Sequence, residues 1–283
     1  MSIAATCASI AAALASAQGG ETIELRGDCP RLVVASEFRQ PVTVDATKAR
    51  VKGLVVTGGG LRWKGGTITA PGGIDGAGPN GYGVKITGRD VTLDGVTITD
   101  AVKGIVLDGA DGVTITGSRL WRLRDDGINA NRSVNLKILR NTFSETRPFP
   151  SVCIEPDGSR KEGGPRRDCK GKWRDGNHAD AVQMRNGVTN AELAYNKVYG
   201  NTQGLAQMGG RGDAALARVT IHHNFVQTSQ SHQITLGDCK ECRIFSNKVV
   251  QAPDSRRKAV IRAGTATRCG NEVPDERPDG SCE

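Results

Sequence analysis

Aromatic side chains are scarce in this chain, and long apolar segments are missing. Its 283 residues include three Trp, three Tyr and five Phe, and 37% of all residues are hydrophobic. So few aromatics leave little to stack on nucleic-acid bases, and a nucleic-acid partner is not expected. No run of about 18 apolar residues occurs, so no membrane insertion is expected. The apolar content is also low for a compact α/β enzyme.

Glycine and positive charge are abundant instead. The 37 glycines suit many short strands joined by tight turns. Disorder is the alternative, but the regular spacing of Val, Ile and Leu described below argues against it. The formal net charge of +8 favours an anionic partner such as an acidic polysaccharide, although charge alone does not identify the partner.

Eight cysteines fall into four groups of sequence neighbours. This even, grouped arrangement predicts four local disulfides and an oxidising compartment. A zinc site at Cys239 and Cys242 is the alternative, but it lacks a second cysteine pair at ligand spacing. The predicted bridges are Cys7–Cys29, Cys153–Cys169, Cys239–Cys242 and Cys269–Cys282.

The first residues lack the usual form of a signal peptide. The stretch from Ile3 to Gln18 is rich in alanine rather than leucine, and no Lys or Arg precedes it. It is better interpreted as a short amphipathic helix. We therefore expect a secreted or periplasmic protein whose secretion signal has already been removed.

One pattern of apolar and small residues recurs along the chain. A period of 22 to 23 residues separates most of its copies, which is one coil of a right-handed parallel β-helix with three strands per coil. Leucine-rich repeats have similar periods, but their Leu-x-x-Leu-x-Leu signature is missing. The marker residues, separated by 22, 23, 55, 28 and 23 residues, are Leu93, Ile115, Ile138, Leu193, Ile221 and Ile244.

Asparagine occupies the equivalent turn position in four consecutive copies of the pattern, at Asn141, Asn196, Asn224 and Asn247. Stacked side-chain amides form hydrogen-bonded ladders in stacked β structures. Period and ladder together predict an all-β fold, with one β-helix domain over residues 1–283. Inside it we expect a capping helix at 1–20, a basic insertion at 147–177 and a C-terminal cap at 265–283.

A second set of strands lies between these copies and presents a polar strip along the helix axis. Seven coils at about 4.8 Å each span roughly 30 Å, long enough for several sugar units. Any solvated sheet face is polar, so the strip alone does not establish a binding groove. The predicted outward residues are Lys85, Val106, Asn129, Gln183, Gln207, Thr235 and Arg262.

Groups that can do chemistry gather where the insertion rejoins the coil. Repeat alignment stacks Asp180 on Asp126 and places His232 in the same register two coils later. Insertions at one edge of a solenoid usually form its binding face. The candidate catalytic residues are therefore His178, Asp180, Arg185 and His232.

The insertion itself is strongly basic, with seven Lys and Arg between residues 160 and 174. A solubilising loop is the alternative, but such a loop need not be both stapled and basic. We expect a flap that attracts and clamps a polyanion through residues such as Arg166 and Arg167. The remaining histidines, His222 and His223, lie on the other strand set and are interpreted as structural.

The coils, the ladder and the entry at residues 19–25 resemble secreted β-helix enzymes that act on polysaccharides, such as pectate, alginate and chondroitin lyases and alginate C5-epimerases. The string from His178 to Gln183 is similar to an HxDxxQ motif of such proteins. The resemblance implies an acidic polysaccharide substrate. The residues expected to bind it are Lys85, Asp126, Asn129, Gln183, Gln207, Arg262, Arg166 and Arg167.

Several functions remain open. β-Elimination, which we favour, needs a base for the C5 proton of a uronate and an acid for the leaving O4. His178 oriented by Asp180 is the expected base, and His232 or Tyr82 the acid. A C5-epimerase shares the first step, and a non-catalytic or tailspike-like β-helix is a further alternative. A glycoside hydrolase would use paired carboxylates drawn from Asp125, Asp126 and Asp180.

Elimination requires no cofactor, although Ca²⁺ is compatible with the many Asp residues. The chain is expected to act as a monomer, because its capped helix is self-contained.

Overall fold

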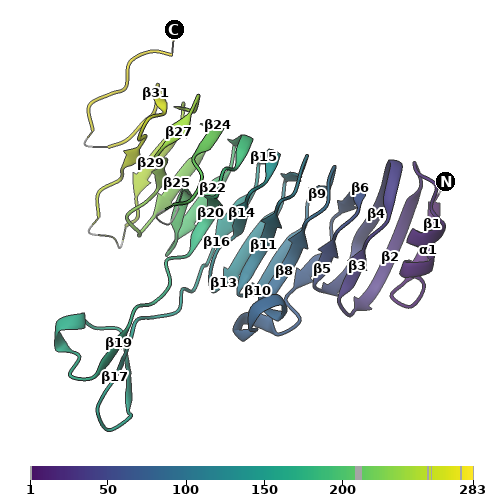
Figure 1. Cartoon of the computed structure of the whole chain (residues 1–283), viewed down its shortest axis with the longest axis horizontal. Coiled ribbons are helices and arrows are strands. Elements are labelled where there is room, and N and C mark those ends of the chain that lie inside the picture. The colour runs from purple at the N-terminus through teal and green to yellow at the C-terminus, as the bar shows by residue number, and fades with distance from the viewer. Residues whose placement is uncertain (1, 208–211, 254, 256, 275, 283) are drawn as a thin grey trace.

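The computed structural model describes residues 2–207, 212–253, 255, 257–274 and 276–282. The chain winds into a parallel β-helix whose coils follow one another from the N-terminal to the C-terminal end (Figure 1). The predicted fold class, a right-handed parallel β-helix, is confirmed. No helix in the described part of the chain is long and apolar enough to cross a membrane.

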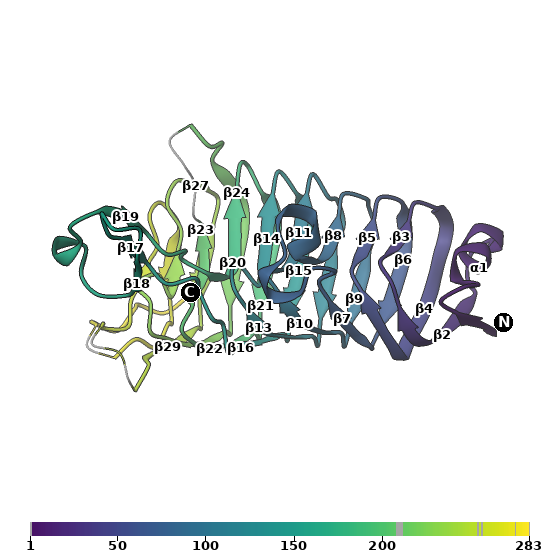
Figure 2. The same ribbon diagram turned by 90° about the horizontal axis from the view of Figure 1, so that it is seen from below.

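One face of the β-helix is a nine-stranded parallel sheet, called sheet B below. Figure 2 shows its strands in order along the axis, from β3 and β5 near the N-terminal end to β23 near the other end. The strands are β3 (Leu32–Val34), β5 (Leu54–Val56), β8 (Tyr82–Ile86), β11 (Lys103–Asp108), β14 (Ile128–Asn131), β20 (Asp180–Arg185), β23 (Gln203–Gln207), β26 (Ile234–Thr235) and β30 (Ile261–Arg262).

The other faces form a continuous 19-stranded sheet, called sheet A below. It turns a corner, because the long strand β4 pairs with β6 along its first half and with β7 along its second. Its strands are β1 (Ser2–Thr6), β2 (Thr22–Cys29), β4 (Glu37–Lys52), β6 (Gly59–Lys64), β7 (Thr67–Thr69), β9 (Thr92–Asp94), β10 (Thr97–Ala101), β12 (Thr114–Thr116), β13 (Arg119–Leu123), β15 (Val134–Leu139), β16 (Thr142–Ser144), β21 (Thr189–Ala194), β22 (Lys197–Gly200), β24 (Leu216–His222), β25 (Phe225–Thr228), β27 (Cys239–Lys240), β28 (Arg243–Phe245), β29 (Lys248–Gln251) and β31 (Thr267–Cys269). Short 3₁₀ turns occur at η1 (Gly73–Asp75), η2 (Gly78–Gly81) and η3 (Arg166–Asp168).

The six marker residues of the repeat lie in one column inside the β-helix. Strand pairing aligns each marker with the next one, and all six are buried. Alternate residues along each strand point into this core, which explains the period of two within strands and of one coil between them. The predicted repeat is confirmed.

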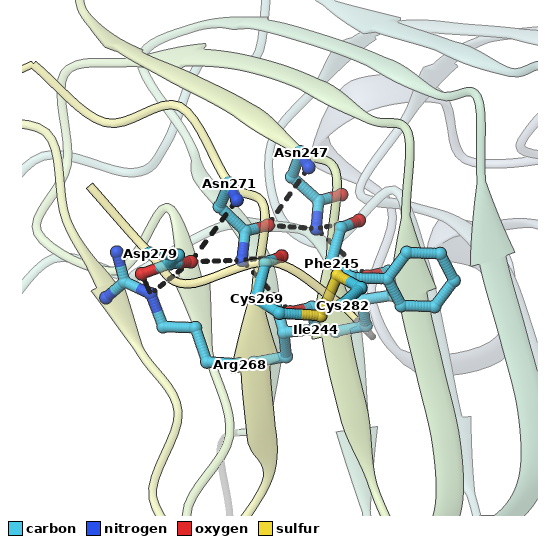
Figure 3. The surroundings of a disulfide bond; sticks show 9 residues. Ile244, Phe245, Asn247, Arg268, Cys269, Asn271, Asp279 and Cys282 are labelled. Carbon is cyan, nitrogen blue, oxygen red and sulfur yellow. Dashed lines mark hydrogen bonds and ion pairs between the residues drawn. A yellow bond between two sulfur atoms is a disulfide. The ribbon is translucent and has the colours of Figure 1, made fainter.

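The asparagine ladder follows the corner of sheet A and is longer than predicted. In each step a backbone N–H donates to the amide oxygen of the next coil's asparagine, as from Asn141 to Asn196 at 3.0 Å and from Asn196 to Asn224 at 2.9 Å. The ladder continues through Asn247 to Asn271. There the Asp279 carboxylate accepts from the Asn271 backbone N–H and side-chain amide and ends the stack (Figure 3).

Replacing a middle rung, Asn196→Ala, is expected to destabilise the fold by about 2–5 kcal/mol. The buried Asn141 N–H would lose its acceptor, and the Ile138 carbonyl would lose the amide that donates to it at 2.8 Å. Each buried polar group left without a partner costs about 1–3 kcal/mol.

Denaturant unfolding measures the change. Asn201→Ala, an exposed amide on the same coil, is the control and should shift stability by less than about 0.5 kcal/mol. Equal unfolding midpoints for the two variants would contradict a stabilising ladder.

The N-terminal cap differs from the expected helix over residues 1–20. The helix α1 spans Ile10–Ser16, and β1 before it pairs in parallel with β2. The reason lies in the alternation of Ile3 and Ala5, which align with Ile23 and Leu25 and suit a strand. Ile10 and Leu14 of α1 are buried, so helix and strand together close the first coil (Figure 1).

All four predicted disulfides form. The Cys269–Cys282 bridge ties the C-terminal segment to β31 (Figure 3). Beside it Arg268 forms ion pairs with Glu276 at 2.6 Å and with Asp279 at 2.7 Å. Part of the predicted cap at 265–283 is therefore the strand β31 of sheet A. The chain after β31 is fixed by the ion pairs of Arg268 and by the disulfide.

The insertion at 147–177 contains a three-stranded antiparallel ribbon of β17 (Val152–Ile154), β18 (Arg160–Glu162) and β19 (Lys172–Arg174). The predicted Cys153–Cys169 bridge staples it. The ribbon extends away from the β-helix body (Figure 1). At its base the Asn177 amide donates to the Arg124 carbonyl at 2.7 Å, which fixes where the insertion rejoins sheet B.

Candidate functional site

Strand register on sheet B defines one outward-facing column of side chains. It confirms the alignment of Lys85, Val106, Asn129 and Gln183. It shifts the register of Gln207 by one residue, because Gln183 pairs with Ala206 and Met184 with Gln207. Ala206 is nevertheless 0% exposed, whereas Gln207 remains partly exposed and its amide group bonds Gly237 and Asp238. The sequence offers no marker for this one-residue difference, because Leu205 and Ala206 are both apolar. The full column is Val33, Val55, Lys85, Val106, Asn129, Gln183, Ala206, Thr235 and Arg262.

A second column lies at the starts of the same strands. The Asp180 backbone N–H donates to an Asp126 carboxylate oxygen at 3.1 Å, which confirms the predicted stacking of these two residues. Asp180 pairs with Gln203, and the Gly204 N–H donates to the His232 carbonyl. His232 therefore stands two coils beyond Asp180, as the repeat alignment predicts.

Asp126 and Asp180 are each 1% exposed, so they lie beneath the surface of the strip. Lys103, one coil before Asp126, binds the Asp126 carboxylate at 2.6 Å and the Asp125 carboxylate at 2.9 Å. Lys103 and Asp125 remain partly exposed, at 24% and 23%. A buried carboxylate needs a charge partner and hydrogen bonds, and Lys103 supplies the charge for Asp126.

Two amides connect the buried carboxylates to the surface. The Asn129 amide donates to Asp126 at 2.7 Å and to the Gln183 oxygen at 2.6 Å. The Gln183 amide in turn donates to Asp180 at 3.0 Å. These bonds fix which way both amides point, so the strip presents preorganised polar groups to a ligand.

Burial sets the protonation of this carboxylate pair. It raises the pKa of Asp180 to about 8, with the nearby Asp126 charge adding to the effect. Burial also raises the pKa of Asp126, while Lys103 and Asn129 oppose that rise. One oxygen of Asp180 has no hydrogen-bond partner, whereas Asp126 has a cation and an amide. The negative charge of the pair therefore resides on Asp126, and Asp180 is protonated at neutral pH.

Imidazoles occupy the surface further along the axis. The Arg262 guanidinium faces Nδ1 of His232 at 3.2 Å, and the Thr235 hydroxyl lies 3.3 Å from the same nitrogen. Burial, followed by the charges of Arg262 and His178, holds the pKa of His232 below its ordinary value. Because guanidinium can only donate, Nδ1 of the neutral ring accepts and Nε2 carries the proton.

His178 is exposed where the insertion meets β20, close enough to His232 for its charge to act on that ring. Beyond His232 lies an open hollow of about 390 Å³. Its lining includes three basic side chains, Arg257, Lys258 and Arg262. Two amides, two imidazoles and a cationic hollow thus follow one another along sheet B and its edge, with the hollow three coils beyond Gln183.

The structure places other predicted residues apart from this group. Arg185 lies in a further outward column with Asn131 and Asp108, and its guanidinium binds Asp213 at 3.1 Å. Tyr82 pairs with Lys103, three coils before Asp180, or roughly 14 Å at about 4.8 Å per coil. That distance excludes Tyr82 as an acid for a bond cleaved at His178.

Arg166 and Arg167 belong to η3, between β18 and β19 of the ribbon. In the described ranges no hydrogen bond or ion pair joins either residue to sheet B, and the ribbon extends away from the β-helix body (Figure 1). Their contact with substrate stays a prediction.

Sequence reasoning missed Lys103, Arg257 and Lys258. The same repeat alignment that stacked Asp180 on Asp126 places Lys103 one coil earlier, and this signal was present in the sequence. The other two residues lie between β29 and β30 in an irregular segment without repeat register. Among the described residues, no three His, Cys, Asp or Glu side chains cluster so as to hold a metal ion.

A family model described as "Right handed beta helix region" matches residues 52–218. No curated protein matches the sequence. Among solved structures the chain is similar to the Dettilon tailspike protein, with 12% identity, a TM-score of 0.57, and coverage of 94% of this chain and 56% of that one. It thus spans little more than half of that protein.

Pectate lyase Pel9A has 12% identity and a TM-score of 0.51, with coverage of 92% of this chain and 64% of the lyase. An alginate lyase from Paenibacillus sp. str. FPU-7 has 16% identity and a TM-score of 0.48, with coverage of 99% and 96%. At such low identities the likeness to the tailspike and to the pectate lyase shows a common fold and nothing finer.

Proposed function

Since this chain belongs to the right-handed β-helix family, and since its sheet B carries imidazoles, amides and cations, we propose that it is a secreted lyase of acidic polysaccharides. It would cleave a uronate-containing chain by β-elimination while the polymer lies along sheet B. The pectate lyase among its structural neighbours has the same fold, and the four disulfides are typical of a protein outside the cytosol.

The observation that carries this proposal is the burial of the carboxylates. A hydrolase needs two carboxyl groups that reach the glycosidic oxygen and a water molecule. Asp126 and Asp180 are each 1% exposed and cannot touch a docked polymer. Asp125 is partly exposed but is bound to Lys103. The accessible groups are those that elimination uses.

The residues suggest a division of labour. His178 is exposed and removes the C5 proton, the electron pair forms the C4–C5 double bond, and the C4–O4 bond breaks. The proton held by His178 passes to the departing O4. His232, neutral and with its proton on Nε2, donates a hydrogen bond to the uronate carboxylate as negative charge develops there. Arg262 and the hollow beyond it neutralise the carboxylate.

Asp126, Asp180 and Lys103 support this reaction without touching substrate. They hold Asn129 and Gln183 in fixed orientations beside the sugar. Among the acidic residues at the strip, Asp108 binds Arg132, and Lys103 binds both Asp125 and Asp126, which reduces the repulsion of a polyanion.

The test is incubation with alginate, pectate, hyaluronan and glucuronan, read at the absorbance of the unsaturated uronate. We expect a steady rise with at least one of these polymers. New reducing ends without a rise in absorbance would contradict elimination.

A further inference from the structure

Two of the four histidines lie on sheet A, in a cluster of rings that the proposed reaction does not use. His222 stacks on Phe245 with the ring centroids 4.9 Å apart, and His223 stacks on Tyr195 at 5.1 Å. The Nδ1 atoms of the two imidazoles are 2.8 Å apart, and Nε2 of His222 bonds Glu192 at 3.1 Å. Four rings are therefore locked together in a chain whose aromatic content is only 4%.

Tyr195 forms the exposed end of this cluster, with 47% of its surface accessible. It sits in the left-handed turn before the ladder residue Asn196, with φ 59°, which directs it away from the core. The Arg140 guanidinium lies 5.4 Å from its ring centre. A ring held by stacking on one partner and by a cation on another loses little freedom when a ligand binds.

An open hollow of about 350 Å³ adjoins the cluster at His222 and is lined by residues of β15, β21 and β24. Lys137 and Arg218 contribute its positive charge, and neither has an acidic partner among the described residues. Glu192 stands beside Lys137 in register but bonds His222 instead. Two amides, Asn135 and Asn190, are joined by a 2.6 Å hydrogen bond and complete the lining.

A purely structural role does not account for this arrangement. Rings that stabilise a fold are usually buried, whereas Tyr195 is among the few large apolar side chains exposed on the described surface. A metal site is not formed either, since no group of three potential ligands occurs among the described residues. What remains is an aromatic platform beside a hollow whose lining includes two cations, two amides and the Glu192 carboxylate that bonds His222, which is the composition of a ligand site.

We propose that this hollow is a second, non-catalytic site that binds a segment of an acidic polysaccharide. One sugar ring of the segment would pack its C–H face on Tyr195. The neighbouring sugars would lie along the hollow, where their carboxylates would meet Lys137 and Arg218 and their hydroxyls would bond the two amides. That this polymer is also the substrate bound on sheet B rests on the proposed function. Such a site tethers the protein to the polymer that it cleaves, and so raises the local substrate concentration.

The test is native electrophoresis in gels that contain alginate, polygalacturonate or neutral dextran. The variant Tyr195→Asn/Lys137→Gln/Arg218→Asn removes the platform and both cations. Asparagine is chosen at 195 and 218 because it tolerates the left-handed backbone that both residues adopt. All proteins carry His178→Ala as well, so that the polymer in the gel stays intact.

We expect retardation of the parent by at least one acidic polymer, and a roughly tenfold weaker apparent affinity of the triple variant. The control Lys48→Gln/Arg50→Gln removes the same two charges from exposed positions elsewhere on sheet A and should leave retardation unchanged. In the chain with His178 intact, the triple change should leave the cleavage rate of short oligosaccharides unaltered.

Equal retardation of the triple variant and the control would overturn the proposal, as would equal retardation of the parent by dextran or no retardation by either acidic polymer. Retardation needs no turnover. A chain that is retarded through Tyr195 but yields no unsaturated product would refute the lyase and leave the second site standing.

Discussion

Replacing His178 by alanine is expected to lower the rate of unsaturated product formation by about 10²–10⁴-fold, the usual contribution of a general base. His178 is exposed at the junction of the insertion with β20, so its removal should leave the fold intact. Product absorbance measures the rate, and thermal unfolding checks the fold.

Chemical rescue distinguishes a residue that transfers the proton from one that only orients neighbouring groups. If His178 carries the proton, free imidazole in the buffer should restore part of the rate of His178→Ala. Imidazole should do nothing for Gln183→Ala, which removes an orienting amide rather than a base. Full activity of His178→Ala without imidazole would refute the assigned role.

Replacing Asp180 by asparagine is expected to change how stability depends on pH. The pKa of Asp180 is raised to about 8 in the folded chain, against about 3.9 for an unfolded Asp. The folded state therefore binds more protons than the unfolded state between these values. The contribution of Asp180 is fully present below about pH 4 and is lost as the pH rises toward 8.

One pKa unit corresponds to about 1.36 kcal/mol, so this loss can reach about 5 kcal/mol. The asparagine side chain of Asp180→Asn does not titrate. The free energy of unfolding of this variant should therefore rise relative to wild type by several kcal/mol between pH 4 and pH 9. Denaturant unfolding across this range measures it, with exposed Asp238→Asn as the control that tracks wild type. A constant difference between Asp180→Asn and wild type would show that Asp180 is ionised throughout.

Much of the fold was predictable because the β-helix repeats its constraints. Each coil must place an apolar residue over the one before, so Leu93 and Ile115 reveal the period without any structure. Asn141 and Asn196 reveal the corner for the same reason, since a rung works only when its neighbour is also a donor and an acceptor. Cysteine spacing sufficed for the bridges.

The site was less predictable, because it depends on how deeply each side chain is buried, and strand register does not determine burial. Register correctly stacked Asp180 on Asp126, but it carries no signal that both carboxylates turn beneath Asn129 and Gln183. Gln207 was aligned with Gln183, whose strand partner is Ala206, because a one-residue shift between two apolar residues leaves no trace in the pattern. The alanine-rich start suited helix and strand equally, and pairing with β2 decided in favour of a strand for Ser2–Thr6.

The most direct measurement of the central claim is mass spectrometry of the two products of an oligosaccharide of known mass. Elimination breaks the C4–O4 bond without adding water, so the two product masses should sum to the mass of the substrate, with the new non-reducing end unsaturated. Products that together carry one added water per cleavage, with no unsaturated end, would instead show hydrolysis and contradict the account.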